Sequence, residues 1–399
     1  MFDVVVVGGG PAGSYTAYQL AKSGLTVLVL EDHKTIGKPR FCTGVISKEA
    51  FNRFDLPKES IQREIKEARF YSPLGSILNI SRDKTQAYVV NRTVFDQGIA
   101  HKAMDEGASY LLSTICDDID IRDDHVRVKI ETQGERFIFK AYICVLAAGT
   151  NYRFHEKLGI GRPVNFLDCA QAELLAKDFC SMEIYLGTEI APESFAWAVP
   201  VSSDLVRVGL STTKRDSSYL LRRLLEKDII RTRIDKIDKK DIQIKRKVIP
   251  YGIIKKSYSD RLVVVGDSAS QTKPTTGGGI FNGLICSSIA AETIISAFEK
   301  GRFGHKGLRI YESRWRREIG HDIRMGFYVR KIFKQFADQH IESLLRLCNI
   351  NEIHAILKKF ADFDRHSYFL VEFMKQPIFW KYLFFKTSGL RYLSTHEGL

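Results

Sequence analysis

Long hydrophobic runs are scarce in this sequence, and their scarcity bears on where the protein works. No apolar run approaches the roughly 20 residues that a helix needs to span a bilayer. The chain passes from Met1-Phe2-Asp3 directly into four valines, whereas a signal peptide has a basic start and a small-residue cleavage site. The sequence therefore predicts a cytoplasmic protein, with peripheral contact to the cytoplasmic membrane face left open.

Cysteine is also sparse, and the arrangement of the seven cysteines argues against a fold held together by disulfides or by structural zinc. They are scattered along the chain, with no CxxC pair and no histidine at metal-binding spacing. An odd, dispersed set of this kind indicates neither a disulfide framework nor structural zinc, so no metal site is predicted. Most of the seven are expected to be small buried side chains. Cys42 is the exception considered below.

Acidic residues are outnumbered, and the formal net charge is +13. Residues 301–399 hold 18 Lys and Arg against 10 Asp and Glu, together with 18 of the 44 aromatic residues. A basic, aromatic region suits an anionic membrane surface, with residues 380–386 (Trp-Lys-Tyr-Leu-Phe-Phe-Lys) at the lipid interface. Packed helices with solvated basic faces explain it equally well. No recognition motif accompanies the charge, so nucleic acid is not predicted as a partner.

The order of the elements indicates an α/β protein. Buried-strand patterns occupy residues 2–7, 25–30, 140–146 and 261–265, and strands of alternating pattern lie between residues 165 and 212. Residues 95–107, 213–247, 280–298 and everything after 300 read as helical. We predict a Rossmann-type domain with an inserted antiparallel β-sheet domain for the substrate and C-terminal helices. The predicted boundaries are 1–50, 90–155 and 258–300 for the nucleotide domain, 51–89 and 156–257 for the inserted domain, and 301–399 for the helices.

The first glycine motif follows the first strand and opens a helix. Gly8 permits the tight turn, Gly10 lets a pyrophosphate approach the backbone, and Gly13 allows close packing of helix on strand. The helix N-terminus, which begins at Pro11 and Ala12, offers free N–H groups to the phosphates. Glu31, at the end of the second strand, is placed to accept hydrogen bonds from a ribose. This fingerprint alone does not separate NAD from FAD.

A second glycine motif favours FAD. Gly266 and Asp267 follow a buried strand, where the Asp can bind a second sugar-like group. A second glycine-rich helix start then suits the far end of a long dinucleotide, with its N-terminal dipole near the flavin edge that gains negative charge on reduction. The residues assigned to this second helix start are Pro274, Gly277, Gly278, Gly279 and Ile280.

Three further segments carry a resemblance to a known family. Residues 37–44 read Gly-Lys-Pro-Arg-Phe-Cys-Thr-Gly, residues 89–96 read Val-Val-Asn-Arg-Thr-Val-Phe-Asp, and residues 192–200 read Pro-Glu-Ser-Phe-Ala-Trp-Ala-Val-Pro. Together with the two glycine motifs, they make residues 1–330 resemble the geranylgeranyl reductase family. That family lies within the wider group of flavoproteins related to para-hydroxybenzoate hydroxylase.

The resemblance implies roles for particular residues. It places Arg92 close to the flavin, Arg40 and Cys42 in a loop beside the flavin ring, and residues 192–200 at the substrate. Within the last segment, Phe replaces a family Tyr at 195 and Val replaces a family Phe at 199, which keeps the wall apolar but removes a hydroxyl. The remaining residues assigned by resemblance are Ala148 and Gly149 for the cofactor, and Phe195, Trp197 and Pro200 for the substrate.

The resemblance implies that reduced FAD delivers hydride to a C=C bond of an isoprenoid chain or prenyl lipid. Cys42 is then either the proton donor or a pocket former, although an inert buried thiol fits the sequence as well. The electron donor is left open between NAD(P)H and a ferredoxin-like carrier. Two alternative functions remain: a flavin-dependent monooxygenase or halogenase, and a non-catalytic isoprenoid or flavin carrier. The monooxygenases usually carry an Asp-Gly motif where this chain has Ala148-Gly149, which disfavours a hydroxylase.

Overall fold

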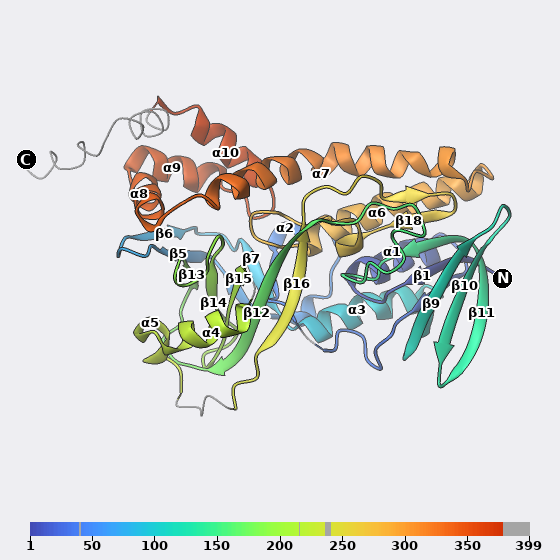
Figure 1. Cartoon of the computed structure of the whole chain (residues 1–399), viewed down its shortest axis with the longest axis horizontal. Helices are drawn as coiled ribbons and strands as arrows, with labels where there is room; N and C mark the ends of the chain where they lie inside the picture. Colours follow the sequence, from blue (N-terminus) through green and yellow to red (C-terminus); the bar gives the residue numbers. More distant parts are fainter. Residues whose placement is uncertain (40, 215, 236–240, 378–399) are drawn as a thin grey trace, which may run out of the picture.

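The computed structural model describes residues 1–39, 41–214, 216–235 and 241–377. Within these residues the strands form three sheets, of eight, seven and three strands, with helices packed around them (Figure 1). The fold is α/β, with a Rossmann-type sheet joined to a largely antiparallel sheet, which confirms the predicted fold class. Two predicted features, Arg40 and the interfacial segment 380–386, lie outside the described residues.

The eight-stranded sheet has a parallel core of apolar strands in the order β18-β11-β1-β2-β8. The valines of β1 lie between β11 and β2 and are almost completely buried. Strands buried on both faces read as continuous apolar runs, so the first two strands could be predicted from the sequence. The antiparallel strands β9, β10 and β17 complete this sheet. The bounds are β1 (Phe2–Val7), β2 (Val27–Leu30), β8 (Ser109–Leu111), β9 (Thr114–Ile121), β10 (Val126–Thr132), β11 (Glu135–Leu146), β17 (Tyr258–Ser259) and β18 (Leu262–Val264).

The seven-stranded sheet has the order β16-β12-β15-β14-β13-β5-β6 and is antiparallel except for the β13–β5 pair. Helices α4 (Ser217–Glu226) and α5 (Asp228–Arg231) pack with it around one apolar cluster. A small sheet of β3 (Val45–Ser47), β7 (Ala87–Val90) and β4 (Ile61–Ile65) lies beside α2 (Lys48–Phe54). The bounds in the larger sheet are β5 (Glu67–Tyr71), β6 (Ile77–Ser81), β12 (Asn165–Leu175), β13 (Met182–Tyr185), β14 (Ala196–Pro200), β15 (Leu205–Thr212) and β16 (Lys245–Tyr251).

One predicted helical region was partly wrong. Residues 213–247 were expected to be a charged helix, but Lys245–Tyr251 form β16, which pairs with β12 along the edge of the sheet. Lys245 and Arg246 are exposed on that edge strand. Charged side chains on an edge strand protect it from pairing with other chains, and such a run resembles a solvated helix in the sequence.

Helix α6 (Ile280–Glu299) corrects a second expectation. It is long and apolar enough to cross a membrane by length and composition, whereas no such segment was expected. However, 72% of its apolar window is buried inside the protein, where α6 packs against α1 (Pro11–Lys22) and α7 (His305–Phe333). A helix that is apolar all round suits a position of this kind, inside a large core.

Helix α3 (Arg92–Asp105) begins earlier than predicted. The Asn91 side chain accepts hydrogen bonds from the N–H groups of Thr93 (3.1 Å) and Val94 (3.4 Å), which caps the first turn. The cap brings Arg92 into the helix, one turn before Asp96. This shift sets the geometry of an ion pair in the candidate site.

The C-terminal helices cover both large sheets (Figure 1). Helix α7 runs along the top of the molecule and buries Tyr311 and Trp315 in the core. Helices α8 (Asp338–Cys348) and α9 (Asn351–Phe360) then lie against β6, and α10 (His366–Met374) returns to pack on α9 and α7. The predicted helical character after residue 300 is therefore confirmed for the described part. The domain boundaries given above stay a prediction.

Candidate active site

One continuous cavity of about 1440 Å³ is lined by both large sheets and by the C-terminal helices. At one end its walls are residues 7–12, 30–33 and 147–151, which include the first glycine motif. Residues 41–47 and 275–281 line its middle, from opposite sides. Apolar side chains of β5, β6, β13, β14, α7, α8 and α9 line the other end. We call this last part the apolar arm.

The first glycine motif forms a backbone cradle at the start of α1. Gly8 has φ +109°, and a Cβ there would lie 2.3 Å from the Ala147 carbonyl oxygen. A Cβ on Gly13 would lie 2.0 Å from the Gly8 carbonyl oxygen, so helix and strand touch through backbone. A Cβ on Gly10, by contrast, would meet no atom within 4 Å. No side chain caps α1, so its first N–H groups remain available beside Pro11 and Ala12, which line the cavity.

Glu31 lies at the end of β2, as predicted from the fingerprint. Its Oε2 accepts a hydrogen bond from the Gly9 N–H (2.7 Å), and its Oε1 lies 2.5 Å from His33 Nδ1. Burial raises the pKa of Glu31, while the hydrogen bonds from His33 and Gly9 lower it. The carboxylate therefore belongs to the wall of the cradle, at the end of the cavity predicted to hold the ribose.

The second glycine motif lies at the start of α6. Asp267 follows β18 and forms an ion pair with Lys247 (3.3 Å), and a Cβ on Gly279 would lie 2.8 Å from its Oδ1. Gly277 has φ +75°, and no side chain caps α6. Ser287 Oγ of α6 donates to the Ala12 carbonyl oxygen (2.8 Å), so the two uncapped helices are joined. The other lining residues of this motif are Gly266, Gly278 and Ile280.

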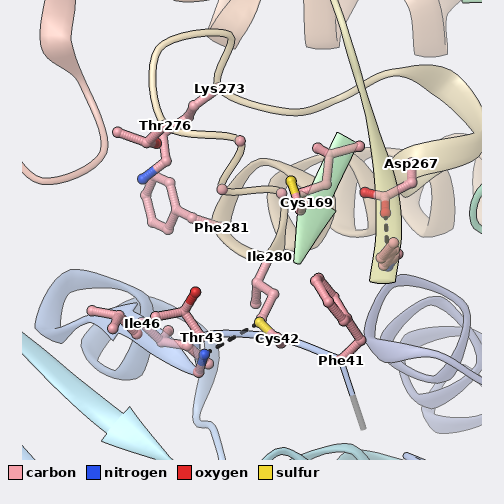
Figure 2. A pocket seen from close by; sticks show the side chains of 18 of the residues that line it. Phe41, Cys42, Thr43, Ile46, Cys169, Asp267, Lys273, Thr276, Ile280 and Phe281 are labelled. Atoms are coloured by element: carbon pink, nitrogen blue, oxygen red, sulfur yellow. Dashed lines mark hydrogen bonds and ion pairs between the residues drawn. The ribbon is translucent and has the colours of Figure 1, made fainter. Parts of the chain in front are cut away.

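Cys42 projects into the middle of the cavity, across from Cys169 and Ile280 (Figure 2). Its Sγ accepts a hydrogen bond from the Gly44 N–H (3.3 Å). Arg92 lies beside it and forms an ion pair with Asp96 (2.9 Å). Burial opposes the charge on Arg92, but the interactions with Asp96 and Cys42 outweigh it and raise the pKa of Arg92. The thiol is thus next to a fixed cation.

Phe195 and Trp197 both line the apolar arm, where their rings meet at a tilt with centroids 5.9 Å apart. Trp197 packs on β15, where a Cβ on Gly209 would lie 2.6 Å from the indole. Ala148 and Gly149 also line the cavity. Among the described lining residues, three predicted site residues are missing: Gly13, Pro200 and Pro274. Gly13 acts through packing, and the Pro274 carbonyl oxygen accepts a hydrogen bond from Arg330 (2.5 Å).

Comparison with known proteins identifies the family. A family model described as lycopene cyclase protein matches residues 3–379. The digeranylgeranylglycerophospholipid reductase of Methanocaldococcus jannaschii is 32% identical over 372 residues, which are 90% of this chain and 94% of that protein. The chain belongs to the geranylgeranyl reductase family. It is an FAD-dependent oxidoreductase, as the two glycine motifs predicted.

Two solved structures show the same fold. A geranylgeranyl bacteriochlorophyll reductase-like protein from Thermoplasma acidophilum has a TM-score of 0.82 at 24% identity and covers 94% of this chain and 98% of its own. The p-nitrophenol 4-monooxygenase of Pseudomonas putida has a TM-score of 0.71 at 18% identity, over 90% of this chain and 98% of its own. A monooxygenase therefore shares the scaffold with this reductase-family chain.

The residues present fit FAD. Gly8 and Gly13 make backbone contacts that any side chain would block, and Gly10 leaves space for a pyrophosphate above an uncapped helix. The second uncapped helix, α6, suits the flavin end. We expect the cradle at α1 and Glu31 to hold the adenosine diphosphate half. The loop at residues 277–279, Asp267 and the Cys42 loop would then hold the flavin half.

A group of charged side chains that was not predicted from the sequence surrounds the second glycine motif. Lys273 Nζ forms an ion pair with Asp364 (2.9 Å), and both side chains are almost completely buried. His366 Nδ1 lies 2.5 Å from Thr275 Oγ1. Burial, and then the charge of Lys273, lower the pKa of His366 to about 4. Only Lys273 carried a signal in the sequence, because it directly precedes the motif.

Arg330 of α7 is the most connected of the missed residues. It is 5% exposed, and burial lowers its pKa. Its guanidinium donates to the carbonyl oxygens of Pro274 (2.5 Å), Thr275 (3.3 Å) and Glu193 (3.1 Å), and to Ser194 Oγ (3.3 Å). It therefore joins the second glycine motif to the segment 192–200 that carries the substrate-site resemblance.

Proposed function

We propose that this protein reduces C=C bonds in the isoprenoid chain of a lipid. The observation that carries the proposal is the continuity of the cavity, which joins two uncapped glycine-rich helix starts to an apolar arm. Its volume of about 1440 Å³ exceeds the roughly 300–1,000 Å³ of a pocket for one small ligand, so it has room for FAD and a second molecule. The relative from M. jannaschii is named for reducing digeranylgeranylglycerophospholipid, which supports a prenyl lipid as that second molecule.

When bound and reduced, FAD supplies the hydride. The protein binds and orients the reactants: the helix N-termini attract the pyrophosphate and the electron-rich edge of the ring. In the arm, the side chains of Phe195, Trp197 and Val199 offer apolar surface to the isoprenoid chain and limit the access of water. Dry surroundings matter here, since an isolated alkene is a poor hydride acceptor.

Cys42 supplies the proton in this proposal. As hydride adds to one alkene carbon, the S–H bond breaks and its proton adds to the other carbon. The resulting thiolate keeps the hydrogen bond from the Gly44 N–H and the neighbouring charge of Arg92. Both contacts lie beside the sulfur atom that gives up the proton.

A second, smaller cavity explains how the thiol regains its proton. Cys42 and Arg92 line this space of about 240 Å³ together with Gln171, Glu173 and Arg207. Polar walls suit water, and a volume of this size has room for several molecules. Water there would return a proton to Cys42 after each turnover.

The electrons come from an external reductant, either NAD(P)H or a ferredoxin-like carrier. A lipid substrate would also bring the enzyme to the membrane surface, as the basic and aromatic composition of residues 301–399 suggests. A halogenase or monooxygenase, and a non-catalytic lipid carrier, are the alternatives that the first experiment separates.

The experiment uses FAD-loaded protein with excess dithionite under anaerobic conditions and a geranylgeranyl phospholipid. The expected product is two mass units heavier per reduced bond in H₂O and four mass units heavier in D₂O, because both added hydrogens come from groups that exchange with solvent before the transfer. FAD-free protein is the control and should give no product. Flavin that transfers hydrogen to no prenyl lipid would contradict the proposal, and monooxygenase substrates would then be tested with oxygen and NAD(P)H.

A further inference from the structure

We infer that helix α8 closes the far end of the apolar arm and sets the length of isoprenoid chain that the enzyme accepts. The inference rests on the proposed function, because it assigns the end of the same cavity. Three side chains of α8 line that end: Leu344, Leu345 and Cys348. None of them belongs to a motif that the sequence singled out.

The end wall is well packed. Leu345 and Cys348 are 4% and 8% exposed and share one apolar cluster with Leu78 of β6 and Leu357 of α9. Phe70 of β5, on the opposite side, belongs to the same cluster and also lines the cavity. Since packed side chains leave little free volume, a longer chain cannot pass α8 without displacing them.

Helix α8 is fixed in place at both ends. The Asp338 carboxylate, at its start, accepts a hydrogen bond from the Thr188 N–H (2.8 Å). Glu342 accepts hydrogen bonds from Ser72 and from Ser76 Oγ (2.5 Å), at the turn between β5 and β6. Asn349 Nδ2, at its end, donates to the Ile77 carbonyl oxygen (3.0 Å). The wall therefore has a defined position relative to the sheet.

The distribution of charge gives the direction of the chain. Among the described lining residues, those of the end wall are all apolar, whereas Lys66, Glu67 and Arg82 line the arm at the other end of the β5–β6 hairpin. The Glu342 carboxylate belongs to α8, but it is bound by two serines and by Arg346 (2.8 Å) and does not line the cavity. The apolar end of the isoprenoid chain thus belongs under α8, and its polar head remains towards the charged residues.

Cys348 is the smallest of the three α8 side chains, so enlarging it shortens the arm most directly. The test uses glycerol phosphate ethers that carry a geranyl, farnesyl or geranylgeranyl chain. Their dissociation constants are measured from the change in FAD absorbance of the oxidised enzyme, and their reduction is measured separately. Cys348→Phe should weaken the geranylgeranyl ether at least about tenfold relative to the geranyl ether, because single methylene groups already change selectivity by about 10–200-fold in apolar pockets.

The matched control is Ile341→Phe on the same helix. Ile341 is 3% exposed and belongs to the same apolar cluster, but it does not line the cavity. It should lower stability without changing the preference between chain lengths. Leu345→Ala provides the opposite change and should improve the binding of a fourth ether, with a geranylfarnesyl chain, relative to the geranylgeranyl ether. If Cys348→Phe does not fold, the smaller Cys348→Met is used.

The outcomes are distinct. If wild type reduces the ethers but Cys348→Phe keeps the wild-type ratio of dissociation constants, α8 does not set the length and the inference is wrong. The same holds if Ile341→Phe shifts the ratio equally. If wild-type enzyme neither binds nor reduces any of the three ethers, it is the proposed function that fails.

Discussion

At the cofactor end of the cavity the walls include the backbone of the first glycine motif, whereas at the far end they are apolar side chains held by long-range contacts. The cradle of Gly8 and Gly13 forms within one strand–turn–helix unit. The end wall depends on contacts such as that between Glu342 and Ser72, which are 270 residues apart. Between them, Cys42 and Arg330 join the two ends.

The difference shows which parts of the enzyme tolerate change. Gly8 and Gly13 accept no added atom, because the nearest neighbour of a Cβ at either position is a main-chain oxygen. Side-chain walls can be repacked at a cost that depends on volume. We therefore expect variants at the cofactor end to abolish function and variants in the apolar arm to alter selectivity.

The largest effect is expected for Gly13→Val. Its Cβ would lie about 2.0 Å from the Gly8 carbonyl oxygen, so α1 cannot remain against β1. The purified variant should be colourless, with almost no FAD by absorbance. Gly320→Ala on α7 is the control, since a Cβ there would have 3.5 Å to its nearest neighbour, and it should keep its FAD. A yellow Gly13→Val protein would show that the cradle is not the cofactor site.

The second-largest effect is expected for Cys42, which lies between the cofactor end of the cavity and the apolar arm. Cys42→Ala should lower kcat about 10²-fold or more, as expected for loss of a general acid, while FAD content stays the same. Cys180→Ala changes an exposed thiol and serves as the control. If kcat and its pH profile are unchanged in Cys42→Ala, then Cys42 only shapes the pocket.

Arg330→Met tests the link between the second glycine motif and segment 192–200. It leaves buried acceptors without their donor, which should lower the free energy of unfolding by roughly 2–4 kcal/mol. The measurement is urea denaturation, with the exposed neighbour Lys331→Met as control. A loss no larger than that of the control would mean that the two motifs are held together by other contacts.

The smallest effect is expected for Glu342→Gln, and it should depend on pH. Burial works against this carboxylate, but hydrogen bonds from Ser72 and Ser76 and the contact with Arg346 lower its pKa to about 2. Because this lies below its ordinary value of about 4.5, the carboxylate stabilises the fold above that pH and loses this contribution as the pH falls towards 2.

Wild type should therefore exceed Glu342→Gln in unfolding free energy by about 1–2 kcal/mol near pH 6, and the gap should shrink as the pH is lowered through 4. Denaturation series at several pH values measure this gap. A gap that is constant with pH would show that the charge of Glu342 contributes nothing, and that only its shape matters to α8.

The sequence predicted those strands and helices that are determined by residues close to one another in the chain. The first strand was expected at residues 2–7 and is Phe2–Val7, because the valine run, the glycine turn and the helix form one short unit. The antiparallel hairpin of β9 and β10 was not predicted, and the first three residues of β16 (245–247) were expected to be helical. β16 pairs with β12, which lies far away in the sequence, so the local sequence does not report that strand.

The candidate site divides in the same way. Phe195 and Trp197 were proposed from spacing and resemblance, and both line the arm. Arg330, Asp364 and His366 were not proposed, because nothing near them in the sequence indicates that they meet the second glycine motif. Only the packing of the C-terminal helices brings them there.

The central claim is that one cavity brings reduced FAD and an isoprenoid chain together. The most direct test is a single turnover: enzyme whose FAD is fully reduced, with no excess reductant, is mixed anaerobically with a geranylgeranyl phospholipid while flavin absorbance is followed. The account predicts that the flavin reoxidises without oxygen and that one C=C bond is lost per FAD. Flavin that stays reduced in the presence of the lipid would contradict it.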